Sequence, residues 1–280
     1  MMNVRSRFRG RVNARTSARA RAAWALSLII PAAAAAAADY VKLPGGDFTS
    51  VLPQGPVQGV AAPVGIAPFL LRVSPVSVGE FRDFILANPQ WQRGRAPSIF
   101  ADVRYLVDWP AADMISPGMD AARRPVTNVS WFAAQAYCDT EHARLPTWLE
   151  WEYAAAADET RLDARRDPAW RRRILSWYER PANSALSPGG GPANAYGVRD
   201  MHGAVWEWVD DFNALFIAGD SRTQGDPDLL KFCGAGAISI VDRDSYAVLM
   251  RIALLSSLNA ADTTSSLGFR CARPIETTPP

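Results

Sequence analysis

The residues that could carry out chemistry gather in one short segment and at the cysteines. Residues 194–208, NAYGVRDMHGAVWEW, hold turn residues, two indoles and the carboxylates of Asp200 and Glu207 within fifteen positions. His202 lies between these carboxylates and could act as a general base, although a loop histidine is more often only a polar residue. The chain also has three cysteines, and an odd number leaves at least one thiol outside any intramolecular disulfide. They are Cys138, Cys233 and Cys271.

The first 38 residues have the pattern of a secretory signal peptide. Seven arginines and no acid precede an apolar stretch, which is interrupted at Pro31 and ends in an Ala-x-Ala cleavage box at 36–38. A spanning helix needs about 20 apolar residues. Because this stretch is shorter and broken, a cleaved leader is favoured over an uncleaved anchor helix. We therefore expect a mature chain at 39–280, located in the periplasm and without membrane attachment.

The basic balance of the chain belongs to this leader. The whole chain has 30 basic and 28 acidic residues, and removal of the seven leader arginines leaves 23 bases and a net charge near −5. Nucleic-acid binding requires clustered Lys and Arg. The arginine-rich run at 161–173 is diluted by acids and is typical of a solvated helix face. We therefore expect no nucleic-acid partner.

Local patterns predict a single α+β domain with short strands, few helices and many loops, because no linker or repeat divides the chain. Three helices are expected to begin at a Ser or Thr cap: Ser77 to about Ala87, Ser130 to about Cys138, and Thr147 to about Ala157. Strands are expected at 66–73, 231–241 and 267–272, and at 39–48 as an edge strand and hairpin with a Gly-Gly turn. Residues 246–251 are ambiguous, and 158–192 are expected to form a long surface loop.

Five motifs then occur in series over nearly the whole mature chain. They are Pro125–Trp131, Ala136–Cys138, Arg144–Thr147 with Glu150–Glu152, Gly203 with Val205–Trp208, and Gly268–Cys271. In this order and at these separations the chain resembles the sulfatase-modifying factor family, whose best-known member is the formylglycine-generating enzyme. The resemblance implies one compact domain at 39–280 with a variant C-type-lectin-like fold.

The resemblance also implies a copper site that this chain has lost. In formylglycine-generating enzymes two cysteines spaced C-x4-C hold copper, because soft thiolates suit Cu(I). Aligning residues 251–257 with the family's arginine-to-double-serine run places these cysteines at Asp242 and Ala247. A carboxylate and a methyl group do not bind Cu(I) usefully, so we expect neither copper nor copper-dependent formylglycine formation. The three-histidine iron site of related proteins is not expected either, because the chain has only His142 and His202.

The same resemblance pairs two of the cysteines. It implies a disulfide between Cys138 and Cys271, which leaves Cys233 over. A buried inert cysteine is the common outcome for such a residue. The alternative hypothesis is that Cys233 faces the former copper pocket and binds a metal or a partner thiol.

A calcium site is the remaining implication for the segment 194–208. The family's ligand pattern carries over to Asp200, Gly203, Val205 and Glu207, and loop oxygens are what Ca²⁺ prefers. The usual asparagine after the glycine is Ala204 here. The alternative is a salt-bridged acidic turn without metal.

Two functions remain open at this point. The first is a non-catalytic accessory protein that assists the maturation of a periplasmic enzyme, since residues 232–234 and 256–258 look similar to the exported subset associated with copper nitrite reductases. The second is a periplasmic oxidoreductase that uses Cys233 to modify a protein or small molecule. Neither the substrate nor the oligomeric state follows from the sequence.

Overall fold

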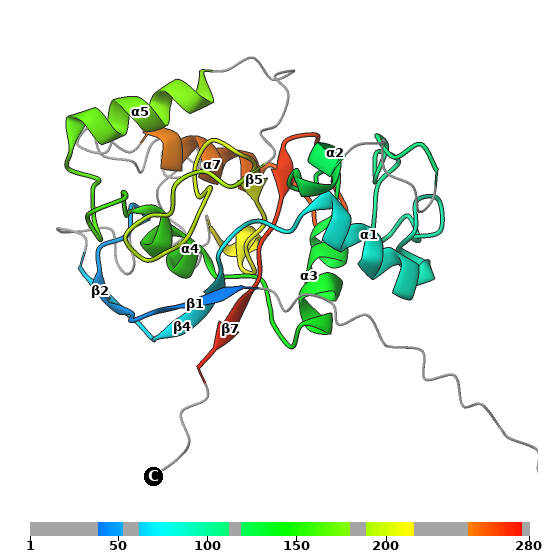
Figure 1. Cartoon of the computed structure of the whole chain (residues 1–280), viewed down its shortest axis with the longest axis horizontal. Helices are drawn as coiled ribbons and strands as arrows, with labels where there is room; N and C mark the ends of the chain where they lie inside the picture. Colours follow the sequence, from blue (N-terminus) through cyan, green and yellow to red (C-terminus); the bar gives the residue numbers. More distant parts are fainter. Residues whose placement is uncertain (1–38, 53–61, 112–118, 180–188, 216–245, 276–280) are drawn as a thin grey trace, which may run out of the picture. The chain divides into compact units, whose positions relative to one another are not determined.

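The computed structural model describes residues 39–52, 62–111, 119–179, 189–215 and 246–275, which belong to one compact unit spanning Ala38–Pro280. The described elements confirm an α+β domain of short strands and few helices (Figure 1). The strands are β1 (Tyr40–Leu43), β2 (Gly46–Phe48), β3 (Val64–Ile66), β4 (Phe69–Arg72), β5 (Trp206–Glu207), β6 (Leu267–Gly268) and β7 (Ala272–Pro274). The helices are α1 (Val78–Ala87), α2 (Met119–Arg123), α3 (Trp131–Thr140), α4 (Trp148–Ala155), α5 (Pro168–Tyr178) and α7 (Tyr246–Ser256), with 3₁₀ turns at Pro89–Trp91 and Phe212–Ala214.

The largest sheet has three strands in the order β1-β4-β7, so β1 lies at its edge as predicted. The predicted hairpin across Gly45 and Gly46 is wrong. Strand β1 pairs with β4, and β2 pairs with β3, so the two glycines mark a bend in one long strand pair. Gly45 has φ +68°, and a Cβ there would lie 2.1 Å from the carbonyl oxygen of Ile66. Pro68 interrupts the facing strand at the same place, because proline has no N–H to donate.

The helix caps predicted from the sequence are present. Ser77 with Glu80 and Thr147 with Glu150 form capping boxes at α1 and α4, and the Ser130 side chain accepts from the backbone N–H of Ala133 at α3. Each cap satisfies backbone donors that a helix start leaves without an intrahelical partner. Helix α4 ends at Ala155, two residues before the predicted end.

Helix α5 lies where a surface loop was predicted. Asp167 caps it by accepting from the backbone N–H of Ala169, and Pro168 occupies its first turn, where a missing N–H costs nothing. Trp170 and Ile174, one turn apart, are buried in a small apolar cluster with Ala164 and Ala247. The loop prediction is therefore wrong at 168–178. The ambiguous segment from 246 is also helical, as the start of α7, whereas the predicted strand at 231–241 lies outside the described residues.

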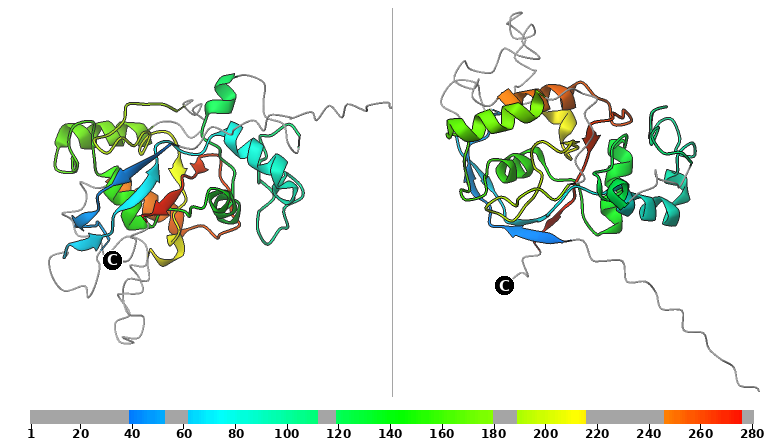
Figure 2. Two further views of the ribbon diagram at one scale, coloured as in Figure 1. Left: turned by 60° about the horizontal axis from the view of Figure 1, so that its bottom comes forward. Right: turned by 45° about the horizontal axis from the view of Figure 1, so that its top comes forward.

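Helix α4 lies between the β1-β4-β7 sheet and the neighbouring pair α5 and α7 (Figures 1 and 2). Helices α1, α2 and α3 lie across β7 from α4, α5 and α7. The main core packs these groups through buried aromatic rings, among them Phe81, Tyr137, Trp148 and Phe269. Over the described ranges, no helix combines the length and hydropathy that crossing a membrane requires. The predicted signal peptide at 1–38 lies outside these ranges.

Candidate functional site

A cavity of about 190 Å³ lies between helix α5 and the segment 191–204. Helix α5 contributes Trp170 and Trp177 to its wall, and the segment contributes His202. The carboxylates in the lining are Asp158, Glu159 and Asp200. Because the cavity joins chemistry-bearing residues from the segment singled out by the sequence with a helix that the sequence analysis missed, it is the candidate functional site.

His202 is surrounded by indoles. Its ring centroid lies 5.6 Å from that of Trp170, 5.8 Å from Trp151 and 6.2 Å from Trp177. Its Nε2 atom lies 2.9 Å from the carbonyl oxygen of Ala155, an acceptor, so the protonated nitrogen is Nε2. Burial lowers the pKa of His202 to about 4, because removal from water disfavours the charged ring and the nearby Arg251 guanidinium repels it. The neutral ring packs as part of the cavity wall, which favours a structural role over that of a general base.

The partly buried, neutral His202 predicts a pH dependence of stability. An unfolded histidine titrates near 6.5, so between that pH and about 4 the unfolded chain binds a proton that the folded chain does not. Stability is therefore unaffected above pH 6.5 and falls as the pH drops through this window, by about 2 kcal/mol at pH 5. Urea unfolding at pH 7 and pH 5 should show a smaller loss for His202→Gln than for the wild type. Equal losses in the two proteins would contradict the prediction, since the carboxylates titrate in both.

Glu207 is a core residue that faces away from solvent. Its Oε1 atom accepts from Nη2 of Arg270 at 2.8 Å, and its Oε2 atom accepts from Nε of Arg270 at 2.9 Å and from Nε1 of Trp151 at 2.8 Å. Both Glu207 and Arg270 are fully buried. Arg270 also donates to the carbonyl oxygens of Arg72, Val73 and Arg199. This ion pair therefore links β5 to the residues between β6 and β7 and, through the carbonyl oxygen of Arg72, to the end of β4.

The backbone conformations of Asp200 and Gly203 determine the course of the chain through residues 194–208. Both have left-handed backbone conformations, with φ +57° at Asp200 and φ +86° at Gly203. The Asp200 carboxylate accepts from the backbone N–H groups of Gly190 at 2.7 Å and Gly191 at 3.1 Å. A Cβ at Gly203 would lie 2.8 Å from the ring of Trp177, so only glycine admits the indole this closely.

These contacts do not fit the predicted calcium site. Calcium takes six to eight oxygen ligands, but the Glu207 carboxylate is fully buried and is paired through both of its oxygens with Arg270, so it is not available to a metal ion. Within the described ranges, no group of three or more His, Cys, Asp or Glu side chains is placed to hold a metal ion. The geometry fits the alternative, an acidic turn held by a salt bridge and backbone donors, and we derive no role for calcium at Gly203 or Val205.

Ala247 is the predicted position of one of the two missing copper-binding cysteines. It lies beside the cavity of about 190 Å³, against Trp170 and Ile174 of the cavity wall. Ala247, in the first turn of α7, is buried with Ala164, Trp170 and Ile174. A second, smaller cavity of about 20 Å³ lies next to it, lined among others by Glu152 and His202. This space suffices for a single water molecule. Asp242 and Cys233 lie outside the described residues, so the metal or thiol binding predicted for Cys233 stays a prediction.

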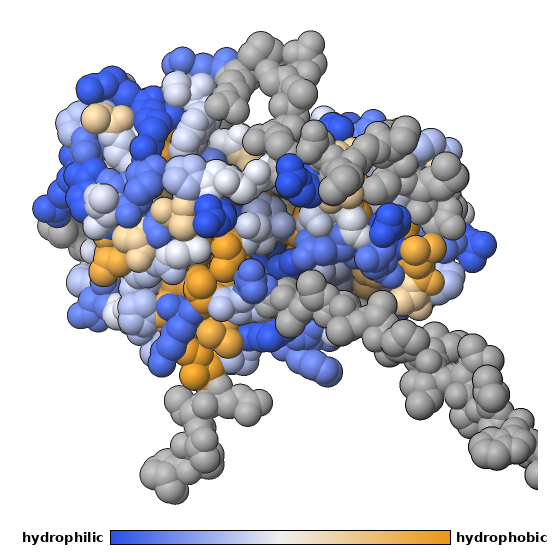
Figure 3. Space-filling view, in the orientation of Figure 1, coloured by the Kyte–Doolittle hydropathy of each residue, from blue (hydrophilic) through white to orange (hydrophobic). Residues whose placement is uncertain are grey.

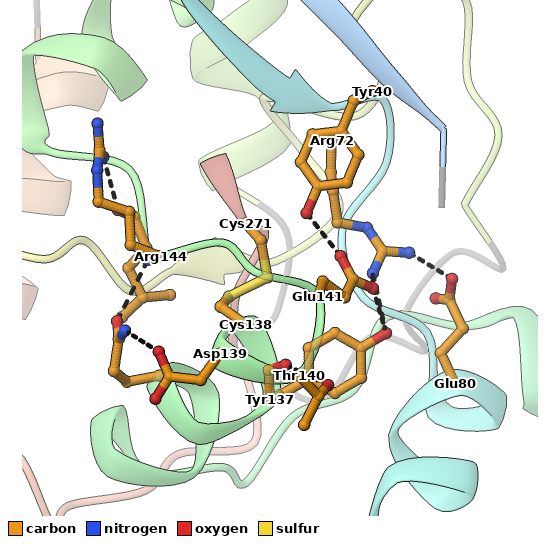
Figure 4. Close-up of a disulfide and its surroundings, with 12 residues drawn as sticks. Tyr40, Arg72, Glu80, Tyr137, Cys138, Asp139, Thr140, Glu141, Arg144 and Cys271 are labelled. Carbon is orange, nitrogen blue, oxygen red and sulfur yellow. Dashed lines mark hydrogen bonds and ion pairs between the residues drawn. A yellow bond between two sulfur atoms is a disulfide. The ribbon is translucent and has the colours of Figure 1, made fainter. Parts of the chain in front are cut away.

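The disulfide implied by the resemblance is confirmed. Cys138 in α3 is bonded to Cys271, just before β7, across a sequence separation of 133 residues. Figure 4 shows a polar group beside it, in which Glu141 accepts from Arg72 at 2.7 Å and from the hydroxyl of Tyr40 at 2.6 Å. The cross-link and this polar group both hold α3 against the three-stranded sheet.

The site residues that sequence reasoning missed are those of α5. Trp170, Arg173 and Trp177 line the larger cavity, yet they fall in the segment that was predicted to be a loop. Two local signals could have found the helix: Asp167 followed by Pro168 is a helix start, and Trp170, Ile174 and Trp177 recur at helical spacing.

Known proteins match the chain over most of its length. The sulfatase-modifying factor enzyme 1-like domain matches residues 27–275. The formylglycine-generating enzyme of Streptomyces coelicolor is 27% identical over 293 residues, which cover 85% of this chain and 90% of that protein. The inactive C-alpha-formylglycine-generating enzyme 2 of Mus musculus is 28% identical over 270 residues, which cover 83% and 84%. The solved structure of PvdO from Pseudomonas aeruginosa is 20% identical with a TM-score of 0.47 and covers 84% of this chain and 94% of that one.

The match to the family domain agrees with the resemblance that the five motifs indicate. The named relatives include both a formylglycine-generating enzyme and an inactive one, so the match specifies the fold and family but not an activity. Because the family domain covers far more than half of its residues, this chain belongs to the sulfatase-modifying factor family.

Proposed function

We propose that this protein is an exported, non-catalytic member of its family that assists the maturation of a periplasmic copper enzyme. Ala247 is the observation that supports the non-catalytic assignment. At the position where the resemblance implies a copper-binding cysteine, a methyl group packs in a buried apolar cluster under α5. A methyl group has no lone pair, so one half of the C-x4-C ligand pair is missing whatever the position of Asp242.

Export is supported by two independent features. The leader at 1–38 has the charge and cleavage pattern of a signal peptide. The Cys138–Cys271 disulfide is of a kind that persists in oxidising compartments such as the bacterial periplasm and is rare in the cytosol. A relative named inactive supports the existence of family members that have kept the fold without the activity.

The accessory role is supported by the similarity of residues 232–234 and 256–258 to the exported subset associated with copper nitrite reductases. Its test is joint export of a copper nitrite reductase with and without this protein. We expect more copper per reductase, and a proportionally higher nitrite-reducing rate, when the two are exported together. Equal copper content and equal rates in the two preparations would contradict the accessory role.

Copper binding by the purified mature protein tests the missing ligand pair separately. We expect the wild type to bind no Cu(I) in competition with a chromogenic chelator, because it lacks both thiolates. The double variant Asp242→Cys, Ala247→Cys restores the C-x4-C spacing and should bind Cu(I). Its control is Asp242→Ser, Ala247→Ser, which has the same size but no thiolate. Tight Cu(I) binding by the wild type that is lost in Cys233→Ala would instead favour the oxidoreductase.

A further inference from the structure

The larger cavity, beside α5, is lined by aromatic rings and carboxylates, the groups that bind cations. We infer that it binds an organic cation, an ammonium or guanidinium group, between the indole of Trp177 and the carboxylates of Glu159 and Asp200. This inference rests on the non-catalytic accessory role proposed above and names the ligand chemistry that the cavity would recognise.

The aromatic wall is the first argument. Trp170, Trp177 and His202 all line the cavity. The face of an indole attracts cations, and aromatic walls are a recurrent way of holding quaternary ammonium groups. Trp177 is held in place by its close packing on Gly203, where a Cβ would meet the ring at 2.8 Å. The low pKa of His202 keeps its ring neutral at physiological pH, so it adds no competing positive charge.

The charges in the lining are the second argument. Asp158 is already paired with Arg161, and Glu159 with Arg173 at 2.9 Å. Asp200 forms no ion pair with any residue in the described part of the chain; its carboxylate is oriented by backbone N–H groups instead. The lining therefore keeps one uncompensated negative charge. An anion is disfavoured, because the N–H groups of Gly190 and Gly191 that could bind it already donate to Asp200.

The position of Arg173 is the third argument, because its guanidinium group already lies against Trp177 and Glu159. Its Cζ atom lies 5.9 Å from the ring centroid of Trp177, and its Nη2 atom pairs with Glu159. The chain's own side chain thus demonstrates that the indole and the carboxylate accept a cation together. The pair is solvent-exposed, with 42% of the Arg173 side chain accessible, so an incoming cation displaces it at small cost.

The size of the cavity limits the ligand. About 190 Å³ is less than the roughly 300 Å³ at which pockets for drug-sized molecules begin. A headgroup or one side chain therefore fits, whereas a large cofactor does not. The surface over α5 is largely hydrophilic (Figure 3), so the occupant arrives from water rather than from an apolar partner surface.

Calorimetric titration of the mature protein tests the inference with two probes. Choline represents a free ammonium ligand, and N-acetylarginine amide represents the side chain of a partner protein. We expect at least one of them to bind, and the tighter one identifies the source. The matched uncharged probes, 3,3-dimethylbutanol and N-acetylnorleucine amide, should bind at least about tenfold more weakly, since they keep the shape without the charge.

Single variants locate the site. Trp177→Leu and Asp200→Asn should each weaken binding of the charged probe by roughly tenfold. Arg173→Gln should tighten it, because the internal competitor is removed. Arg172→Gln, an exposed arginine of the same helix outside the lining, is the matched control and should leave the affinity unchanged. Near-UV circular dichroism of each variant shows that the fold is retained.

Three results would overturn the inference: no binding of either charged probe, equal binding of charged and uncharged probes, or wild-type affinity in both Trp177→Leu and Asp200→Asn. None of these measurements includes copper or a reductase. A failed cation titration together with a positive joint-export result therefore rejects this ligand chemistry while the accessory role stands, and the reverse pattern rejects the accessory role alone.

Discussion

Replacing Glu207 with glutamine is expected to lower the free energy of unfolding of the mature protein by about 3–5 kcal/mol. The substitution keeps the size of the side chain and an oxygen for Nε1 of Trp151, but it removes the charge opposite Arg270. Because both partners are fully buried, the guanidinium would be left without its counter-ion in the core. Urea unfolding followed by tryptophan fluorescence measures the loss.

The control for this prediction is a pair at the surface. Glu159→Gln removes the carboxylate that pairs with Arg173, and 39% of that glutamate side chain is exposed to solvent. Exposed ion pairs contribute about 0–1 kcal/mol, so this variant should unfold close to the wild type. A similar, small loss for both variants would contradict the structural role assigned to the Glu207–Arg270 pair.

The same experiment separates the ion pair from the calcium site considered earlier. If Glu207 served as a calcium ligand, the unfolding midpoint of the wild type would rise with added Ca²⁺ and fall with a chelator, since a ligand that binds only the folded state stabilises it. We expect no such dependence. A calcium-dependent midpoint that disappears in Glu207→Gln would restore the ligand assignment and reject the one made here.

Removing the Cys138–Cys271 disulfide is the second change with a large expected effect. The bond joins residues 133 positions apart, and a cross-link that closes a loop of this length restricts the unfolded chain strongly. The variant Cys138→Ser, Cys271→Ser should therefore lose about 3–5 kcal/mol of stability, measured by urea unfolding of the mature protein. Both cysteines are fully buried, so the serine hydroxyls would also enter an apolar environment.

Cys233→Ser controls for the removal of a thiol as such. It keeps the cross-link, which mass measurement after alkylation verifies. The double serine variant should unfold at a clearly lower urea concentration than this control. If the two unfold together, the disulfide does not stabilise the domain, and its role would be limited to holding α3 near the sheet during folding.

Local sequence determined the helix starts of this protein. The caps at Ser77, Ser130 and Thr147 are present because a cap depends on a side chain and a backbone group only two or three residues apart. Asp167 and Pro168 carry the same kind of local signal for a helix start. The helical spacing of the apolar residues in α5 is less evident, because three arginines at 171–173 lie between them. The Gly45-Gly46 bend was misread because only the facing strand distinguishes a bend from a hairpin turn.

Ordered motifs determined the family and the cysteine pairing. The five motifs are short, but their order along the chain carries the resemblance to the family, and that resemblance implied both a single compact domain and the Cys138–Cys271 bond. The missing thiolate at Ala247 was also visible in the sequence, because a residue type limits the chemistry wherever the residue lies.

Only the tertiary structure decided which groups face one another. Asp200 and Glu207 are seven positions apart, and the sequence made them equal candidates for a metal site; in the fold Arg270 takes one carboxylate into the core, and two glycine amides orient the other at a cavity. The indoles of α5 meet His202 from more than twenty residues away. Such long-range pairings depend on the packing of distant elements, and no local spacing encodes them.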